Sequence, residues 1–372
     1  MRIVPLLHHL ARCAATLTVC LCAFASPSAA NAESTLNVAN WTDYIDQKAL
    51  EEFTKETGIK VIYDTYDSNE ILETRLLAGG TGYDIVVPSA TFLQRQIKAG
   101  VFQKLNKALL PNLKGVAPEI SSRLSAYDPG NEFSVPYMWF TTGIAYNTSK
   151  VKDRLGDRAM DTWDVVFKPE NMKKLADCGV YFLDSPEDVL AIAAKYAGLS
   201  PELKDAANVR KAAEIVARVR PYVRKFHSSE YINALANGDI CLAIGWAGDS
   251  FQARTRAREA GAGVDIAYVN PREGTLMSID ALAIPKDAQH VAEAHKFIDF
   301  LLRPEIAARN TQVTNFANPV SASRPLLPED VASNKSIYPD ETTERKLFTV
   351  SAKDADIQKT ITREWSRVKL GR

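Results

Sequence analysis

The sequence predicts an α/β fold, and three observations lead to that prediction. Segments that read as strands alternate with helical segments of about 10–15 residues, which is typical of βαβ units. Some strand segments are nearly continuous apolar runs, such as YDIVVPS at 83–89, as expected inside a parallel sheet. The chain has 372 residues, 46% of them hydrophobic, so it is long enough for a large core and two domains.

Residues 1–32 differ in character from the rest of the chain. Arg2 and Arg12 precede a short apolar stretch at 13–25, and Ala30-Asn31-Ala32 follows as an A-x-A site. This order is typical of a secretory signal peptide, and we expect cleavage after Ala32. The remaining chain carries 43 basic and 45 acidic residues, a formal charge of −2. This balance argues against nucleic acid as a partner.

The first half of the mature chain alternates regularly between strands and helices. Gly58 is placed to stop the first helix, and Gly79 with Gly80 to stop the second. We expect strands at 34–41, 59–67 and 83–89, and helices at 46–58, 69–80 and 91–100.

The alternation breaks at 133–147, an apolar-aromatic run that contains Pro136 and lacks a helical period. We expect this run to carry the chain between two lobes. A second α/β region then covers 180–198, a helix near 208–219 and the segment 239–261, in which Gly245 and Gly248 are expected to let the chain turn sharply. Another change of pattern follows at 264–288, and 290–310 reads as one long surface helix.

Signatures of an enzyme or a metal site are missing from the mature sequence. Its histidines are His227, His290 and His295, and the last two are five residues apart, which is not the spacing of metal ligands on one helix face. No nucleophile elbow, phosphate-binding loop or dinucleotide fingerprint occurs in the sequence. We therefore expect no catalytic residue, no metal and no cofactor.

Acidic, aromatic and hydroxyl residues instead recur where predicted strands end. Ligands of open α/β sheets bind at the carboxyl ends of strands. The candidates are Trp41, Thr42, Asp43, Tyr44, Ser89, Thr91, Asp188 with its neighbour Glu187, Trp246, Asp249 and Asp280.

Each candidate also has a structural interpretation. Asp43 suits a helix cap, Trp41 a core position, and Asp188 the first turn of a helix, where a negative charge complements the dipole. Asp280 is harder to explain structurally, because a carboxylate inside an apolar segment needs a partner.

Together these residues suit a cationic ligand. Aromatic faces attract cations, and carboxylates accept charge-assisted hydrogen bonds from ammonium groups. An amino-acid ligand would need an Arg for its carboxylate, and a sugar would need fewer acids.

Cys178 and Cys241 are the cysteines that remain after residue 32. A secreted protein meets an oxidising environment, so a structural disulfide is favoured over two free thiols.

The chain resembles the periplasmic polyamine-binding proteins of bacterial ABC importers, closest to the putrescine/spermidine-binding branch. The resemblance rests on NWTDYI, YDIVVPSATFLQRQIKAGVFQ, VPYMWFTTGIAYN, KPENM, CGVYFLDSPEDV, FHSSEYINALANGDICLAIGWAGD and RPEIA, and it extends from about residue 36 to the C-terminus. It implies the two-lobed type II periplasmic-binding-protein fold, with the ligand cleft between the lobes. The implied lobes are 33–140 plus 260–325 and 141–259 plus 326–372.

The resemblance also implies a function and a residue set. The chain would be a periplasmic receptor, expected as a monomer and not an enzyme, that delivers a linear polyamine to an ABC permease. The implied contacts are the candidates above together with Ser228, Ser278 and Phe316, and the family's cysteine pair matches Cys178 and Cys241.

Two positions depart from the family pattern. Ser278 stands where an aromatic is expected, and Phe316 stands where a tyrosine is expected. These departures keep open a receptor for another cationic or polar solute, such as agmatine or an opine. The sequence also leaves open an amine-converting enzyme and a sensor that signals ligand occupancy.

Overall fold

Nine strands form a continuous sheet in the computed structural model, which describes residues 34–261 and 263–372. The spatial order is β2-β1-β3-β9-β4-β7-β5-β6, with β8 paired to β4. The strands are β1 (Thr35–Trp41), β2 (Lys60–Tyr66), β3 (Ile85–Val86), β4 (Ser134–Asn147), β5 (Val180–Phe182), β6 (Lys225–Phe226), β7 (Leu242–Trp246), β8 (Ile266–Val269) and β9 (Met277–Ala283).

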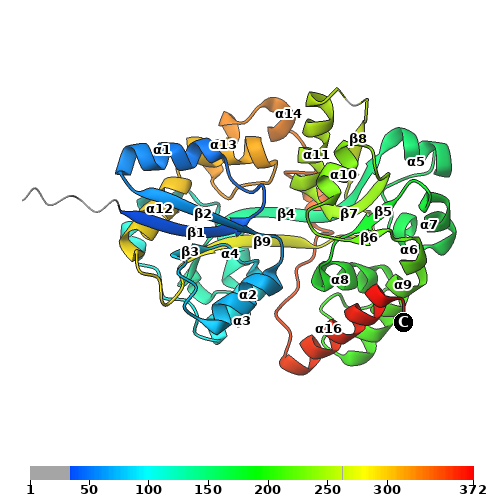
Figure 1. The fold of residues 1–372 in the computed structure, drawn as a ribbon, viewed down its shortest axis with the longest axis horizontal. Coiled ribbons are helices and arrows are strands. Elements are labelled where there is room, and N and C mark those ends of the chain that lie inside the picture. The colour runs from blue at the N-terminus through cyan, green and yellow to red at the C-terminus, as the bar shows by residue number, and fades with distance from the viewer. Residues whose placement is uncertain (1–33, 262) are drawn as a thin grey trace, which may run out of the picture. The chain divides into compact units, whose positions relative to one another are not determined.

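Helices cover both faces of this sheet (Figure 1). They are α1 (Gln47–Thr57), α2 (Asn69–Ala78), α3 (Ala90–Lys98), α4 (Pro118–Ser125), α5 (Thr148–Leu155), α6 (Asp164–Phe167), α7 (Pro169–Leu175), α8 (Pro186–Tyr196), α9 (Ala206–Val219), α10 (Tyr231–Ala236), α11 (Ala247–Glu259), α12 (Val291–Leu301), α13 (Pro304–Thr314), α14 (Glu329–Ala332), α15 (Glu341–Glu344) and α16 (Ala355–Leu370). Among the residues described, no helix combines the length and the apolar character needed to cross a membrane.

The long strand β4 belongs to both halves of the sheet. Its residues 134–141 pair with β9, and its residues 142–147 pair with β7 and β8. The expectation that this apolar run connects two lobes agrees with that pairing. The run has no helical period because it is a strand that is buried along nearly its whole length.

The predicted elements of the first half are confirmed in kind and order, although the strand expected at 83–89 is only Ile85–Val86. β1 pairs in parallel with β2 and β3, as the apolar strand pattern indicates. Gly58 ends α1 with a φ of 72°, and Gly79 follows α2 with the same φ. Both are backbone conformations that favour glycine.

Two expectations for the second half were wrong. The segment 290–310 is not one helix, because Arg303 is extended and Pro304 begins a second helix, and Phe297 and Ile306 are fully buried rather than on the surface. Gly245 and Gly248 do not form a sharp turn, since Gly245 lies within β7 and Gly248 within α11.

These two glycines permit close packing instead. A Cβ atom on Gly245 would lie 2.6 Å from the Tyr231 ring, and one on Gly248 would lie closer still to the Phe316 ring. Real Cβ atoms do not come that close to other atoms, so glycine is required at both positions by space.

The predicted disulfide is confirmed, with Cys178 bonded to Cys241 and their Cα atoms 5.5 Å apart. The bond joins the segment after α7 to the residue before β7. The predicted signal peptide, residues 1–32, lies outside the described residues.

The C-terminal segment returns to the half of the sheet that holds β5, β6 and β7. There α16 packs on α8 and α9 (Figure 1). β8 also belongs to this half through its pairing with residues 144–147 of β4, although the implied partition puts 266–269 in the other lobe. The lobe boundaries themselves stay a prediction.

Candidate functional site

A pocket lies where the ends of β1 and β7 face β9. Trp41 is the last residue of β1, and Trp246 is the last residue of β7. Asp280 comes from the middle of β9, and Asp249 from the first turn of α11. We call this pocket the inner compartment, and it is lined by Trp41, Thr42, Tyr44, Tyr66, Ser89, Phe140, Ser228, Trp246, Asp249, Asp280 and Phe316, among others.

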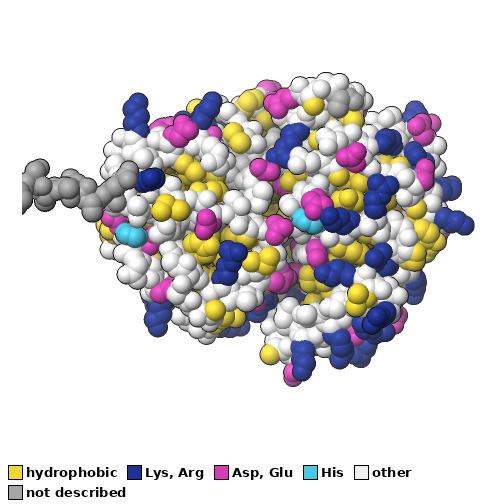
Figure 2. All heavy atoms as spheres, in the orientation of Figure 1, with side chains coloured by type: hydrophobic (Ala, Val, Ile, Leu, Met, Phe, Trp, Pro, Cys, Tyr) yellow, Lys and Arg dark blue, Asp and Glu magenta, His cyan; other side chains and the backbone are white. Residues whose placement is uncertain are grey.

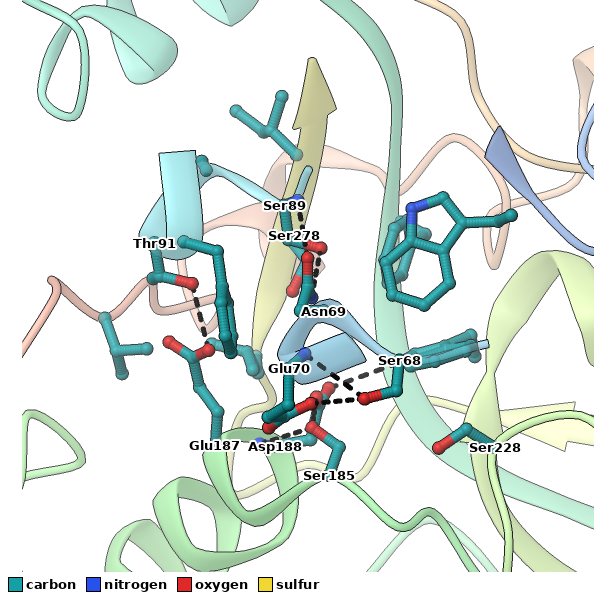
Figure 3. Close-up of a pocket in the computed structure, with 18 of the residues that line it drawn as sticks. Ser68, Asn69, Glu70, Ser89, Thr91, Ser185, Glu187, Asp188, Ser228 and Ser278 are labelled. Carbon is teal, nitrogen blue, oxygen red and sulfur yellow. Dashed lines mark hydrogen bonds between the residues drawn. The ribbon is translucent and has the colours of Figure 1, made fainter. Parts of the chain in front are cut away.

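A second pocket adjoins the first and is richer in polar groups (Figure 3). We call it the outer compartment, and it is lined in part by Glu70, Thr91, Ser185, Glu187, Asp188 and Ser278. Both compartments share Trp41, Phe140, Trp246, Ser89 and Ser228 as wall residues. The two pockets are therefore successive parts of one cleft.

Three aromatic residues line both compartments, and we call them the aromatic throat: Trp41, Phe140 and Trp246. The rings of Trp41 and Trp246 are 5.8 Å apart between centroids, and so are those of Phe140 and Trp246. The indole N–H of Trp41 donates to the Val87 carbonyl at 2.9 Å, and that of Trp246 donates to Asp188 Oδ1 at 3.2 Å. These bonds fix the orientations of the two indole rings in the cleft wall.

Asp280 is a buried carboxylate whose hydrogen-bond partners are neutral. The Ser89 hydroxyl donates to Asp280 Oδ1 at 2.6 Å, and Ser89 Oγ itself accepts from the Asn69 amide at 3.0 Å. Burial raises the pKa of Asp280 to about 7, against the lowering effect of the hydrogen bond from Ser89. Among the described residues no cationic side chain forms an ion pair with it.

Asp249 has a comparable setting on the other side of the inner compartment. The Tyr231 hydroxyl donates to Asp249 Oδ2 at 2.7 Å and accepts from the backbone N–H of Trp246 at 3.0 Å. Burial raises the pKa of Asp249 to about 7, and the negative charges of Asp43 and Asp280 add to this effect. A cation placed between Asp249 and Asp280 would relieve the desolvation cost of both.

Asp188 lies in the outer compartment in the first turn of α8, which Ser185 caps. It accepts from Thr142 at 2.6 Å and from Ser185 at 2.5 Å, besides Trp246. Burial raises its pKa. The neighbour Glu187 accepts from Thr91 at 2.9 Å, and burial raises its pKa to about 7. Both acids line the outer compartment, and the predicted place of Asp188 in the first turn of a helix is confirmed.

Asp43 lies outside the walls of both compartments. It has a φ of 56°, and its carboxylate pairs with Arg256 of α11 at 2.7 Å. It is not a helix cap either, because Asp46 caps α1 by accepting from Lys48. A ligand contact through Asp43 stays a prediction, and this ion pair is its role in the structure.

The other predicted residues come together in the cleft. Trp41, Thr42, Tyr44, Ser89, Ser228, Trp246, Asp249, Asp280 and Phe316 line the inner compartment, and Thr91, Asp188 and Ser278 line the outer one. Segments far apart in the sequence thus converge at one place.

Several wall residues were missed by sequence reasoning. Phe140 belongs to an apolar run in which no periodic pattern singles it out. Tyr231, which is not a wall residue, was missed as well, and its hydroxyl donates to Asp249 from outside the pocket. Tyr66 was within reach of the strand-end argument, because it ends β2 in register with Trp41 and its ring lies 5.0 Å from that of Trp41. Asn69 and Glu70 begin α2 and gave no signal.

The surface around the site is divided in charge. Figure 2 shows several acidic side chains near the middle of the drawn face, while Lys and Arg gather toward its right-hand side. A neighbouring groove at the mouth is lined by Asp67, Glu70, Asp184 and Lys369 among others, and Lys369 pairs with Asp184 at 2.9 Å. Asp67 and Glu70 are therefore the acids that this groove presents toward an approaching cation.

Comparisons with known proteins agree with this architecture. Residues 48–339 match the family model described as bacterial extracellular solute-binding protein. The putrescine-binding periplasmic protein SpuD of Pseudomonas aeruginosa is 50% identical over 338 residues, and PotF of Escherichia coli, also a putrescine-binding periplasmic protein, is 48% identical over 342 residues. Each match covers 91% of this chain and 92% of the relative.

A solved structure shows the same fold. The spermidine/putrescine ABC transporter substrate-binding protein PotD of Streptococcus pneumoniae has a TM-score of 0.74 at 28% identity, over 91% of this chain and 99% of that one. The two-lobed α/β fold expected from the sequence is thereby confirmed. The chain belongs to the family of bacterial extracellular solute-binding proteins, within the group that contains the putrescine-binding periplasmic proteins.

Proposed function

We propose that this chain is a periplasmic receptor that captures a linear polyamine of the putrescine/spermidine type and delivers it to an ABC permease. One observation carries the proposal: two buried carboxylates without cationic partners among the described residues, Asp249 and Asp280, flank a pocket walled by Trp41, Trp246 and Phe316. One ammonium group would sit between the acids, and the alkyl chain would lie against the rings. The relatives named for putrescine binding support the same ligand class.

We also propose that the chain binds its ligand without converting it, that it acts as a monomer, and that it functions after export from the cytoplasm. The sequence expectation of a signal peptide cleaved after Ala32 would place the receptor in the periplasm. The partition into lobes 33–140 plus 260–325 and 141–259 plus 326–372 is part of the proposal, although β8 pairs on the second side. The two lobes would close over the ligand and so present a closed surface to the permease.

Isothermal titration calorimetry with putrescine, cadaverine, spermidine and spermine tests the proposal. We expect at least one amine to bind with a dissociation constant of about 1 μM or tighter, which corresponds to about −8 kcal/mol. A thermal-shift series with the same amines is the independent check. Absence of both heat and stabilisation with every amine would disprove the proposal.

A receptor for another cationic solute is the second candidate. Ser278 is the observation that favours it, because the aromatic ring expected there is replaced by a small hydroxyl side chain that lines the outer compartment. Agmatine and an opine belong in the same titration series. Binding of one of these with an affinity above that of every polyamine would replace the first candidate by the second.

A further inference from the structure

The cleft continues beyond the aromatic throat into a space with its own acids. Asp188 is 7% exposed, Glu187 is half-buried, and Glu70 is exposed at the mouth. Figure 3 shows Glu70, Glu187 and Asp188 coming from α2 and α8 toward the same space. These carboxylates therefore form a graded series that leads from the throat to the solvent.

Neutral donors hold the two deeper acids in place. Asp188 accepts from Thr142, Ser185 and Trp246, while Glu187 accepts from Thr91. Among the described residues, neither acid belongs to an ion pair with Lys, Arg or His within 4.0 Å. These hydrogen bonds orient the carboxylates, and neither is paired with a cation within 4.0 Å, although the charge of Lys353 is near enough to lower the pKa of Glu187 in part.

Ser278 determines how much room lies next to these acids. It is two residues from Asp280 on β9, so both side chains point to the same face of the strand, about 7 Å apart along it. Its partner in the sheet is Phe140 of the aromatic throat. Ser278, Phe140 and Glu187 all line the outer compartment, so a ring at 278 would take up part of that compartment beside Phe140, whereas serine adds only a hydroxyl.

The number of acids exceeds what a diamine can match. Asp249 and Asp280 serve the inner compartment, and Asp188 and Glu187 the outer one. A diamine brings two positive charges to these four acids and a linear triamine brings three, so the triamine can contact more of them. The methylene segments of such a ligand would pass through the aromatic throat.

We propose that Ser278 is a specificity-determining residue that opens the outer compartment for the third cationic nitrogen of a linear triamine, so that the chain prefers a triamine to a diamine. The inference rests on the proposed function and narrows its substrate class. One terminal ammonium lies between Asp249 and Asp280, the middle nitrogen lies near Asp188, and the far ammonium reaches Glu187.

Calorimetry of the full mature chain with spermidine and putrescine tests this assignment. We expect the wild type to bind spermidine about tenfold more tightly or better. Ser278→Phe should lower the spermidine-to-putrescine affinity ratio by about tenfold, while Ser278→Ala, which keeps the space, should change it by less than about threefold.

Glu187→Gln should lower the ratio by about tenfold, and Glu259→Gln on the exposed end of α11 is the matched control.

The outcomes separate this inference from the proposed function. Equal affinities, or tighter binding of putrescine, would overturn the inference and leave a polyamine receptor. Tighter binding of agmatine than of spermidine would also overturn it, because the outer compartment would then recognise a guanidinium group. If the wild-type chain bound none of the amines, both this inference and the proposed function would be disproved. Retained putrescine binding and an unchanged melting temperature show that a Ser278→Phe protein is folded.

Discussion

Asp280 stands in the middle of a buried strand with neutral partners only. Its position combines a high desolvation cost with a hydrogen bond from Ser89 that favours the charged form. Tyr44 responds in turn, because burial and the nearby Asp280 raise its pKa well above the ordinary value. A carboxylate placed in this way contributes little to the stability of the free protein, and it gains a charged partner only when a cation enters.

Replacement of this charge should weaken binding specifically. We expect Asp280→Asn to lower the affinity for the best polyamine by about tenfold or more, equivalent to about 1.4 kcal/mol, because one charge-assisted contact is lost. The same change at exposed Asp153 on α5 is the matched control. Calorimetry gives both values, and an affinity equal to wild type would remove Asp280 from the site.

The raised pKa values of Asp249 and Asp280 predict a pH dependence with a defined sign. Both carboxyls have a pKa of about 7 in the free protein against 3.8 in the unfolded chain, so the native state binds protons more tightly between these values. The free protein should therefore lose stability as pH rises from about 4 to about 7, and chemical denaturation at several pH values measures this loss.

Amine binding should show the opposite trend, because it needs the ionised acids. Affinity should rise with pH up to about 7 and level off until the amine itself loses protons near about pH 10. Titrations at about pH 6 in two buffers of different ionisation enthalpy measure the released protons. Heats that do not depend on the buffer would contradict the raised pKa values.

At the scale of elements, α11 determines the shape of the inner compartment through a contact that only glycine allows. Gly248 in its first turn lies against Phe316, and Phe316 packs on Tyr44 with ring centroids 4.6 Å apart. The position of the helix thus determines where one aromatic wall stands.

We expect Gly248→Ala to displace Phe316 and lower both stability and affinity. The added Cβ would overlap the ring and must move it, at a cost of about 1–3 kcal/mol for overpacking. Gly115→Ala is the control, since its nearest neighbour would be 3.7 Å away. Chemical denaturation and calorimetry measure the two effects, and the double change with Phe316→Leu should recover part of the stability. Wild-type behaviour of Gly248→Ala would show that the ring adapts freely.

Helices and strands could be predicted from the sequence where one local feature, such as the apolar pattern or a stop glycine, was clear. The strand at 35–41 and the helix at 47–57 follow from apolar pattern and from Gly58 as a stop. The packing role of Gly248 was not predictable, because it depends on a ring that comes much later in the chain, and helical periodicity carries no information on such contacts. The break at Pro304 was within reach, since proline favours the first turn of a helix.

The site shows the same division. Acids and aromatics were identifiable because ligands of α/β sheets bind at the carboxyl ends of strands, and Trp41, Trp246 and Asp249 do meet in one pocket. The strands β1 and β7 run in opposite directions, so their carboxyl ends meet because each half of the sheet ends at the cleft. The pairing of Asp43 with Arg256 joins the segment after β1 to α11, and no local pattern reports it. Tyr231 was missed for the same reason, since its hydroxyl acts from behind the pocket wall.

At the scale of the whole molecule, the Cys178–Cys241 bond should contribute to stability and not to binding. It closes a loop with a sequence separation of 63, and neither cysteine lines either compartment. We expect the double change to alanine to lower the free energy of unfolding by about 2–5 kcal/mol and to leave polyamine affinity within about twofold. Denaturant titration and calorimetry give the two numbers, with the reduced wild-type protein as the comparison. Unchanged stability on loss of the bond would contradict the expectation.

The shared strand β4 has an evolutionary consequence. Because its first residues pair with β9 and its last with β7 and β8, each half of the cleft is encoded by separated stretches of the gene. Recombination that exchanges one contiguous block of the gene therefore cannot transfer one half of the cleft intact. New ligand preferences in such a lineage are then more accessible through single codon changes at wall positions such as 278.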